Sequence, residues 1–194
     1  MERCKWVTNH PLYLDYHDHE WGKPNFDDHY LFEMLCLEGA QAGLSWFTIL
    51  QKRENYRKAF DNFNPSKIIN YDQEKIKQLL DNPGIVRNKL KINSVISNAK
   101  AYLKIVESGQ AFSNYIWQFT DGKPIINHWE NDREVPVSTE ISEQISKQLK
   151  KDGFKFVGPK ICYAYMQAVG LVNDHTINCF CHPNNPKNIS NLNR

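Results

Sequence analysis

Apolar residues recur along most of the chain at the three- and four-residue spacings of an amphipathic α-helix. One such stretch contains Leu90, Val95, Ile96, Ala99, Tyr102, Leu103 and Val106, and another contains Trp46, Ile49, Leu50, Arg53 and Tyr56. The alternation that predicts a β-strand is scarce. Turn-forming residues separate the helical stretches, at Pro65, 82–84, 121–124 and Gly153. The pattern therefore predicts an all-α protein of short helices joined by compact turns.

The length and composition fit one globular protein. The chain has 194 residues, of which 41% are hydrophobic, enough for a sizeable core. We predict one folded unit over residues 1–183, made of two closely packed helical lobes, and a loose tail over residues 184–194. The chain starts without the apolar stretch of a signal peptide, and no run approaches the roughly 20 apolar residues of a membrane span. We therefore expect a cytoplasmic protein, and a monomer.

Cysteine and histidine residues gather near the two ends of the chain. The five cysteines are an odd number, which in a reducing compartment favours metal binding or simple burial over disulfides. A Cys2His2 set typical of tetrahedral zinc is formed by Cys4, His17, His175 and Cys179. If helical, the last two share one face. Other candidates that spacing does not exclude are His19, Cys181 and His182. Four protein ligands would leave no position for water, so such a zinc ion would be structural.

A basic hairpin separates two predicted helices. One helix is predicted from Pro136 to Lys151, and the next begins at Pro159, which suits a first helical turn. Gly158 leaves backbone N–H groups free to bind a phosphate at the helix N-terminus. The surrounding lysines are Lys147, Lys150, Lys151, Lys155 and Lys160. The element resembles the helix-hairpin-helix of DNA repair proteins, and the alternative is an ordinary helical hairpin with a solvated lysine face.

A carboxylate falls on the apolar face of another predicted helix. Glu38 follows Leu35, Met34 and Leu31 by three, four and seven residues, which places it on their side and away from Glu33. An isolated buried carboxylate is costly, so it must be paired, neutralised or directed at a polar ligand. The position alone is equally consistent with a salt bridge or a capping contact.

Several blocks together resemble one family. They read MERC-x-W (1–6), YHD-x-EWG (16–22), LFEM (31–34), LEG-x-QAGLSW (37–46), GI-x-R (84–87), KFVG (155–158) and LVNDH (171–175). In register, they resemble 3-methyladenine DNA glycosylase I, a bacterial DNA repair enzyme. The resemblance implies a helix-hairpin-helix fold whose termini are joined by a structural zinc ion on Cys4, His17, His175 and Cys179. It also implies a pocket for the methylated base built around Glu38, Tyr16 and Trp46, with Tyr13 and Trp6 close by. Glu38 is the expected catalytic residue, and it either binds the base only or also helps water to attack.

The resemblance further implies how DNA is bound and cut. The enzyme would flip 3-methyladenine out of double-stranded DNA, hydrolyse its glycosidic bond, release the free base and leave an abasic site. The expected DNA contacts are Gln41, Gly43 and Leu44, as a wedge that fills the gap, and Val157, Gly158 and Lys160 on the hairpin. For Leu44 the alternative is simple core packing.

One position limits the mechanism. Many helix-hairpin-helix glycosylases carry an aspartate where this chain has Asn173, a departure that the resembled family shares. Asp174 could in principle assist instead. A cationic methylated base leaves readily, so strong acid catalysis is unnecessary. Lys160 occupies the place of an amine nucleophile in bifunctional relatives, but without the aspartate we predict a monofunctional enzyme.

Two other classes of protein remain to be distinguished. A zinc hydrolase or base deaminase needs an open metal position, and typically His-x-Glu with Pro-Cys-x-x-Cys, motifs that are absent from this sequence. A non-catalytic DNA-binding module would use the hairpin and the metal only to hold a duplex. Release of free base from methylated DNA separates the three.

Overall fold

The computed structural model describes residues 2–185. The helices are α1 (Pro11–His19), α2 (Asp28–Gln41), α3 (Trp46–Ala59), α4 (Pro65–Ile68), α5 (Gln73–Asp81), α6 (Lys89–Glu107), α7 (Phe112–Trp117), α8 (Glu140–Lys151) and α9 (Pro159–Ala168). Two strands, β1 (Ile125–Ile126) and β2 (Val172–Asn173), and short 3-10 turns complete the described part. The sequence pattern predicts an all-α protein; the described part is mainly helical, with the short β1–β2 pair as the departure.

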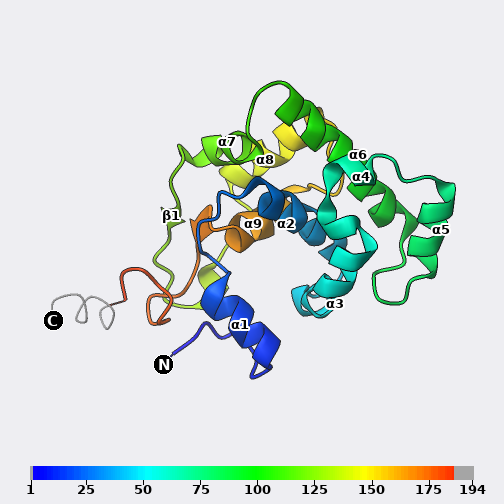
Figure 1. Cartoon of the computed structure of the whole chain (residues 1–194). Helices are drawn as coiled ribbons and strands as arrows, with labels where there is room; N and C mark the ends of the chain where they lie inside the picture. The colour runs from blue at the N-terminus through cyan, green and yellow to red at the C-terminus, as the bar shows by residue number, and fades with distance from the viewer. Residues whose placement is uncertain (1, 186–194) are drawn as a thin grey trace.

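The central helix is α2, which packs against α3, α6, α7 and α9 (Figure 1). Because neighbours surround it, every residue from Leu31 to Ala40 is buried, as expected for a helix that is apolar on most sides. Glu33 is therefore buried as well as Glu38, on another side of the helix. The helical periodicity places Glu33 away from the apolar face of α2, but that side of the helix is also covered by neighbouring elements.

Two predicted helices differ from the structure in detail. The apolar stripe assigned to residues 90–106 is wrong at its ends: Leu90 is 70% exposed and Val106 is also exposed, at the two ends of α6. The helix predicted from Pro136 begins instead at Glu140. Thr139 caps it, because its hydroxyl accepts from the Ser142 N–H while the Ser142 hydroxyl accepts from the Thr139 N–H.

The strands form a small parallel pair that joins distant segments. Ile125 lies opposite Val172 and Ile126 opposite Asn173. The pairing aligns the loop after β1 with the segment after β2, where the Ile177 N–H donates to the Trp129 carbonyl at 2.9 Å. The Phe180 N–H in turn donates to the carbonyl of Glu2, so the two ends of the described chain lie together.

The C-terminal tail predicted over residues 184–194 falls mostly outside the described residues, which end at Asn185. That residue is buried, and its side-chain amide donates to the Cys179 carbonyl at 2.9 Å. The packed region therefore extends two residues beyond the predicted boundary at 183.

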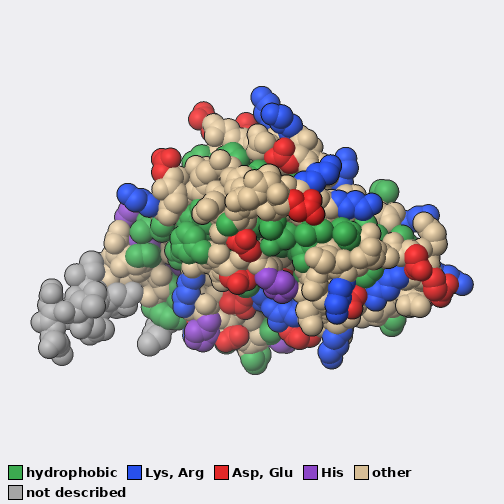
Figure 2. All heavy atoms as spheres, turned by 45° about the horizontal axis from the view of Figure 1, so that its top comes forward, with side chains coloured by type: hydrophobic (Ala, Val, Ile, Leu, Met, Phe, Trp, Pro, Cys, Tyr) green, Lys and Arg blue, Asp and Glu red, His purple; other side chains and the backbone are tan. Residues whose placement is uncertain are grey.

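The surface carries mixed charge. Acidic and basic side chains intermingle over the face shown in Figure 2, in keeping with a net charge of only +2. Any attraction for a polyanion must therefore come from local groups of residues. Within the described part of the chain, no helix combines the length and the hydropathy needed to span a bilayer.

Candidate functional site

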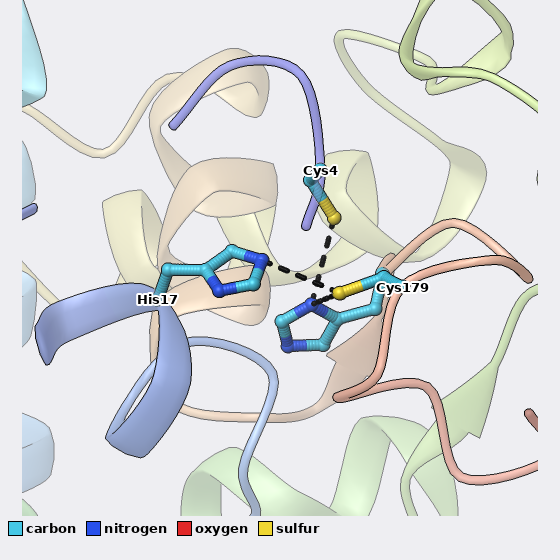
Figure 3. Close-up of side chains that lie close together, drawn as sticks. Cys4, His17 and Cys179 are labelled. Carbon is cyan, nitrogen blue, oxygen red and sulfur yellow. Dashed lines mark hydrogen bonds between the residues drawn. The ribbon is translucent and has the colours of Figure 1, made fainter. Parts of the chain in front are cut away.

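Four buried side chains converge where the chain ends meet. Cys4 comes from the N-terminal segment, His17 from α1 and Cys179 from the C-terminal loop, and they point toward one another in Figure 3. The Sγ of Cys179 lies 3.5 Å from His17 Nε2 and 3.4 Å from His175 Nδ1, and Cys4 Sγ lies 3.6 Å from that same Nδ1. Tetrahedral zinc with ordinary Zn–S and Zn–N bond lengths separates sulfur from nitrogen by about 3.5 Å. The donor set therefore fits a zinc ion in identity and spacing.

Both histidines are oriented by a second hydrogen bond. The Nδ1 of His17 donates to the Asp18 carboxylate at 2.8 Å, and Asp18 is in turn paired with Arg3. The Nε2 of His175 donates to the Trp21 carbonyl at 3.0 Å. Because one nitrogen of each ring is a donor, the other keeps its lone pair: that of His17 lies near the Cys179 sulfur, and that of His175 lies near the sulfurs of both Cys4 and Cys179. Such outer partners are a regular feature of metal-binding histidines.

The expectation that His175 and Cys179 share a helix face is wrong. They lie after β2 in a loop and turns, and the close approach results from that loop doubling back. Among the other candidates, His19 is exposed and pairs with Asp15. Cys181 directs its sulfur at the His17 carbonyl, 3.9 Å away, although it also groups with His17 and Asp18.

A cavity of about 490 Å³ opens beside this cluster. Its lining includes every pocket residue named from the sequence, namely Trp6, Tyr13, Tyr16, Glu38 and Trp46, and also Gln41 and Lys160. Residues that sequence reasoning missed are Trp21, Asp132, Val135, Pro136, Val137, Tyr163, Ala164 and Gln167. The volume lies within the usual range for small-molecule sites.

Glu38 is the only carboxylate of α2 facing this cavity, and it is 2% exposed. Among the described residues its Oε2 atom has no hydrogen-bond partner, and burial raises the pKa of the carboxyl to about 8. Glu33, five residues earlier on another side of α2, instead binds Arg53 and Arg57 at 2.8 Å each. The salt-bridge alternative thus describes Glu33 and does not describe Glu38.

Aromatic side chains form two walls around the carboxylate. Tyr16 and Trp46 lie with ring centroids 5.3 Å apart, and Trp6 meets Tyr13 and Trp21 edge-on at 5.1 and 4.9 Å. The indole N–H groups of Trp6 and Trp46 are buried without a partner in the described structure. Burial and the nearby Glu38 raise the pKa of Tyr16, which keeps its hydroxyl neutral. The walls offer flat faces and free donors to a ring-shaped ligand.

A third wall comes from α9 and depends on Asp174. The Tyr163 hydroxyl and the Gln167 amide, one turn apart, both donate to Asp174 Oδ2 at 2.7 Å. Asn127 and Trp129 donate to Oδ1 at 2.7 and 2.8 Å. With four donors bound, this buried carboxylate is saturated, so it holds the wall in place. The i, i+4 spacing of Tyr163 and Gln167 indicated a shared face but not which face meets the cavity.

The loop after α2 lies at the cavity mouth. Gln41 lines the cavity, and Gly43 adopts a φ of +76°, a left-handed conformation that glycine accommodates without strain. Leu44 is 41% exposed, so the alternative of simple core packing is wrong for this residue. Ser45 then caps α3 by accepting from the Thr48 N–H.

The hairpin between α8 and α9 leaves the backbone N–H groups at the start of α9 without a side-chain cap. Val157 is buried, and its carbonyl accepts from the Ser146 hydroxyl at 2.6 Å. Gly158 is the N-cap of α9 and has no side chain to cover the first helical N–H groups. Lys160 follows on the first turn and reaches the cavity lining.

The fold is shared with solved structures of DNA-base glycosylases. A crystal structure of 3-methyladenine DNA glycosylase I superposes with a TM-score of 0.93 at 52% identity, covering 94% of this chain and all of that one. A structure on 3-methyladenine recognition by the Staphylococcus aureus glycosylase has a TM-score of 0.91 at 38% identity, covering 94% of this chain and 97% of that one. DNA-3-methyladenine glycosylase 1 of Escherichia coli (strain K12) is 50% identical over 185 residues, 95% of this chain and 99% of that protein.

The chain belongs to the methyladenine glycosylase family, whose sequence profile matches residues 6–182. The resemblance inferred from the sequence blocks is thereby confirmed.

Proposed function

We propose that this protein excises 3-methyladenine from alkylated DNA by hydrolysing its N-glycosidic bond. The observation that carries the proposal is Glu38, a buried residue that lines an aromatic cavity and whose Oε2 has no hydrogen-bond partner among the described residues. A group this costly to bury is expected where a ligand completes its hydrogen bonding. The family membership and the names of the relatives specify that ligand as a methylated adenine.

The cavity suits a cationic purine. Adenine methylated at N3 carries a positive charge while it is attached to deoxyribose, and Tyr16 and Trp46 provide aromatic faces for stacking on it. A cation against such a face gains roughly 0.5–2 kcal/mol, which unmodified adenine does not receive. The positive charge of the bound base favours the ionised form of Glu38, which then accepts hydrogen bonds from the exocyclic amino group of the base. Selection for the lesion thus rests on charge as well as shape.

The chemical step needs little acid catalysis. The bond between the base nitrogen and the sugar C1′ breaks, its electron pair neutralises the cationic base, and the oxygen of water bonds to C1′ with loss of a proton. Asp174 takes no part as a general base, because all of its hydrogen-bonding capacity is used by Asn127, Trp129, Tyr163 and Gln167. The product is an abasic site, and Lys160 acts as a phosphate contact.

Access to the lesion requires base flipping. We propose that Leu44, exposed on the loop with Gln41 and Gly43, enters the duplex and fills the gap. The α8–α9 hairpin is the helix-hairpin-helix element, in which the N–H groups after Gly158 and the charge of Lys160 bind backbone phosphates.

A zinc ion held by Cys4, His17, His175 and Cys179 would act structurally, as a cross-link with all four positions filled by protein. Its value to the site is positional. His17 follows Tyr16 directly, and the ring centroid of Trp6 lies 5.4 Å from that of His17. Fixing His17 therefore fixes two sides of the base pocket.

The test is release of free 3-methyladenine from methylated duplex DNA, followed by chromatography. We expect free base and an alkali-labile abasic site in equal amounts. Release of a deaminated base would indicate a deaminase, and tight duplex binding with no released base would indicate a DNA-binding module. Leu44→Ala should slow excision from duplex DNA more than from single strands, whereas equal rates would remove Leu44 as the wedge.

A further inference from the structure

Two polar side chains of α6, Lys91 and Asn98, are buried outside the cavity lining. Lys91 and Asn98 are 8% and 1% exposed, and they are separated by seven residues, which is two helical turns or about 10 Å along the axis. Neither lines the pocket. Burying a polar side chain is costly unless it is hydrogen-bonded, so the partners of these two residues indicate what they do.

Lys91 binds the end of the helix that carries Glu38. Its ammonium donates to the Ala40 carbonyl at 2.8 Å and to the Ala42 carbonyl at 2.6 Å. Ala42 is the C-cap of α2 and opens the loop to Gly43 and Leu44. The lysine thereby satisfies two carbonyls that the helix end leaves unpaired and places a positive charge at the negative end of its dipole. Burial lowers the pKa of this ammonium, so the contact has a cost.

The Asn98 side chain likewise binds backbone groups, here those of Lys155 in the α8–α9 hairpin. Its Oδ1 accepts from the Lys155 N–H at 2.8 Å, and its Nδ2 donates to the Lys155 carbonyl at 3.3 Å. The next residue, Phe156, has a φ of +56°, a strained conformation for a non-glycine residue. The amide thus clamps the hairpin at its strained point, just before Val157 and Gly158.

We propose that α6 is a brace that sets the spacing between the Leu44 wedge and the phosphate-binding hairpin, with Lys91 and Asn98 as its two positioning residues. The inference rests on the proposed function of those two loops. Flipping requires the wedge to enter the duplex while the hairpin holds the backbone, so an error in their separation weakens both contacts at once. A displacement of about 1 Å in such an arrangement can reduce a rate by up to 10²-fold.

The experiment compares Lys91→Met with Lys91→Arg, using Lys100→Met as a control that removes an exposed lysine from the same helix. Three quantities are measured: single-turnover excision from duplex DNA, excision from single-stranded DNA, and affinity for free 3-methyladenine. We expect Lys91→Met to slow duplex excision by about tenfold or more while free-base affinity stays within about twofold. Single-stranded DNA should be cut nearly normally, and Lys91→Arg should restore most of the duplex rate.

Asn98→Ala supplies the second arm. If both residues act through one spacing, Lys91→Met combined with Asn98→Ala should slow duplex excision by less than the product of the two single effects. Multiplicative effects would show two independent loops and overturn the brace, as would an unchanged duplex rate in Lys91→Met. An equal loss of free-base affinity would show that Lys91 supports the pocket instead.

Two controls distinguish a failure of the proposed brace from a failure of the proposed function on which it rests. If Leu44→Ala cuts duplex DNA at the normal rate, the proposed wedge is wrong, whatever Lys91 does. If Lys91→Met fails to fold, Lys91→Gln, which keeps an N–H donor group but no charge, replaces it in the same three measurements. The brace is overturned if that folded variant slows cutting of single-stranded and duplex DNA equally.

Discussion

Replacing Glu38 by Gln separates a binding role from a structural one. The change keeps the side chain's shape but removes its charge and turns one acceptor into a donor. Because Oε2 of Glu38 has no protein partner among the described residues, little native hydrogen bonding is lost. The variant loses instead the charge-assisted contact to the methylated base. We expect base binding and excision to weaken by roughly 1.5–3 kcal/mol, about 10- to 150-fold.

The same substitution should change how stability depends on pH. Burial raises the pKa of Glu38 from 4.5 to about 8, so the folded protein holds a proton that the unfolded chain releases between these values. The wild-type protein therefore loses stability as pH rises from about 4.5 to 8, by up to about 3 kcal/mol at pH 7. The Gln variant cannot ionise, so the two should be similar near pH 4.5 and the variant more stable above pH 7.

Two measurements on one variant test this reasoning. Tryptophan fluorescence gives the affinity for 3-methyladenine, since Trp6 and Trp46 line the cavity, and denaturant unfolding at several pH values gives stability. A Glu38→Gln protein that is destabilised at pH 8, yet binds and excises the methylated base normally, would refute the role assigned to Glu38.

Other expectations follow from separate parts of the structure. Cys179→Ser should lose bound zinc and melt at a lower temperature; a full zinc complement with unchanged melting would contradict the metal site. Gly158→Asp with Lys160→Ala should weaken DNA binding across sequences and reduce its salt dependence while free-base affinity holds, as filter binding at several salt concentrations would show. Asp174→Asn should destabilise the fold by about 1–3 kcal/mol, but a loss of excision of about 10²-fold or more in the folded protein would identify a general base. Borohydride during turnover should trap no covalent protein–DNA adduct, and an adduct dependent on Lys160 would show a bifunctional enzyme.

Local spacing predicted some of the site well. Glu38 could be placed on a buried helix face because its separation from Leu31, Met34 and Leu35 is a property of a single helix. Whether the carboxylate is paired depends on where the arginines of α3 lie, and both of them turn toward Glu33. No periodicity within α2 carries that information.

Features that depend on contacts between distant segments could not be predicted from the sequence. The cavity wall of Tyr163 and Gln167 is fixed by Asp174, whose position follows from the two-residue pairing of β1 with β2. Strands this short leave no alternation to detect. The approach of His175 to Cys179 also arises in a loop, so the helical spacing indicated two residues that do lie together, but through a conformation that they do not adopt.

The contact between the N-terminal segment and the loop after β2 sets an order for folding during synthesis. Cys4 and His175 are 171 residues apart, and at typical rates of translation the second follows the first by roughly 10–30 s. Until then Cys4 and His17 have no partners from the C-terminal loop, and Trp6 and Tyr16 lack the anchor that holds them against the cavity. The nascent chain can build α2 and α3 early, but the cluster of Cys4, His17, His175 and Cys179 is complete only once the loop after β2 has emerged.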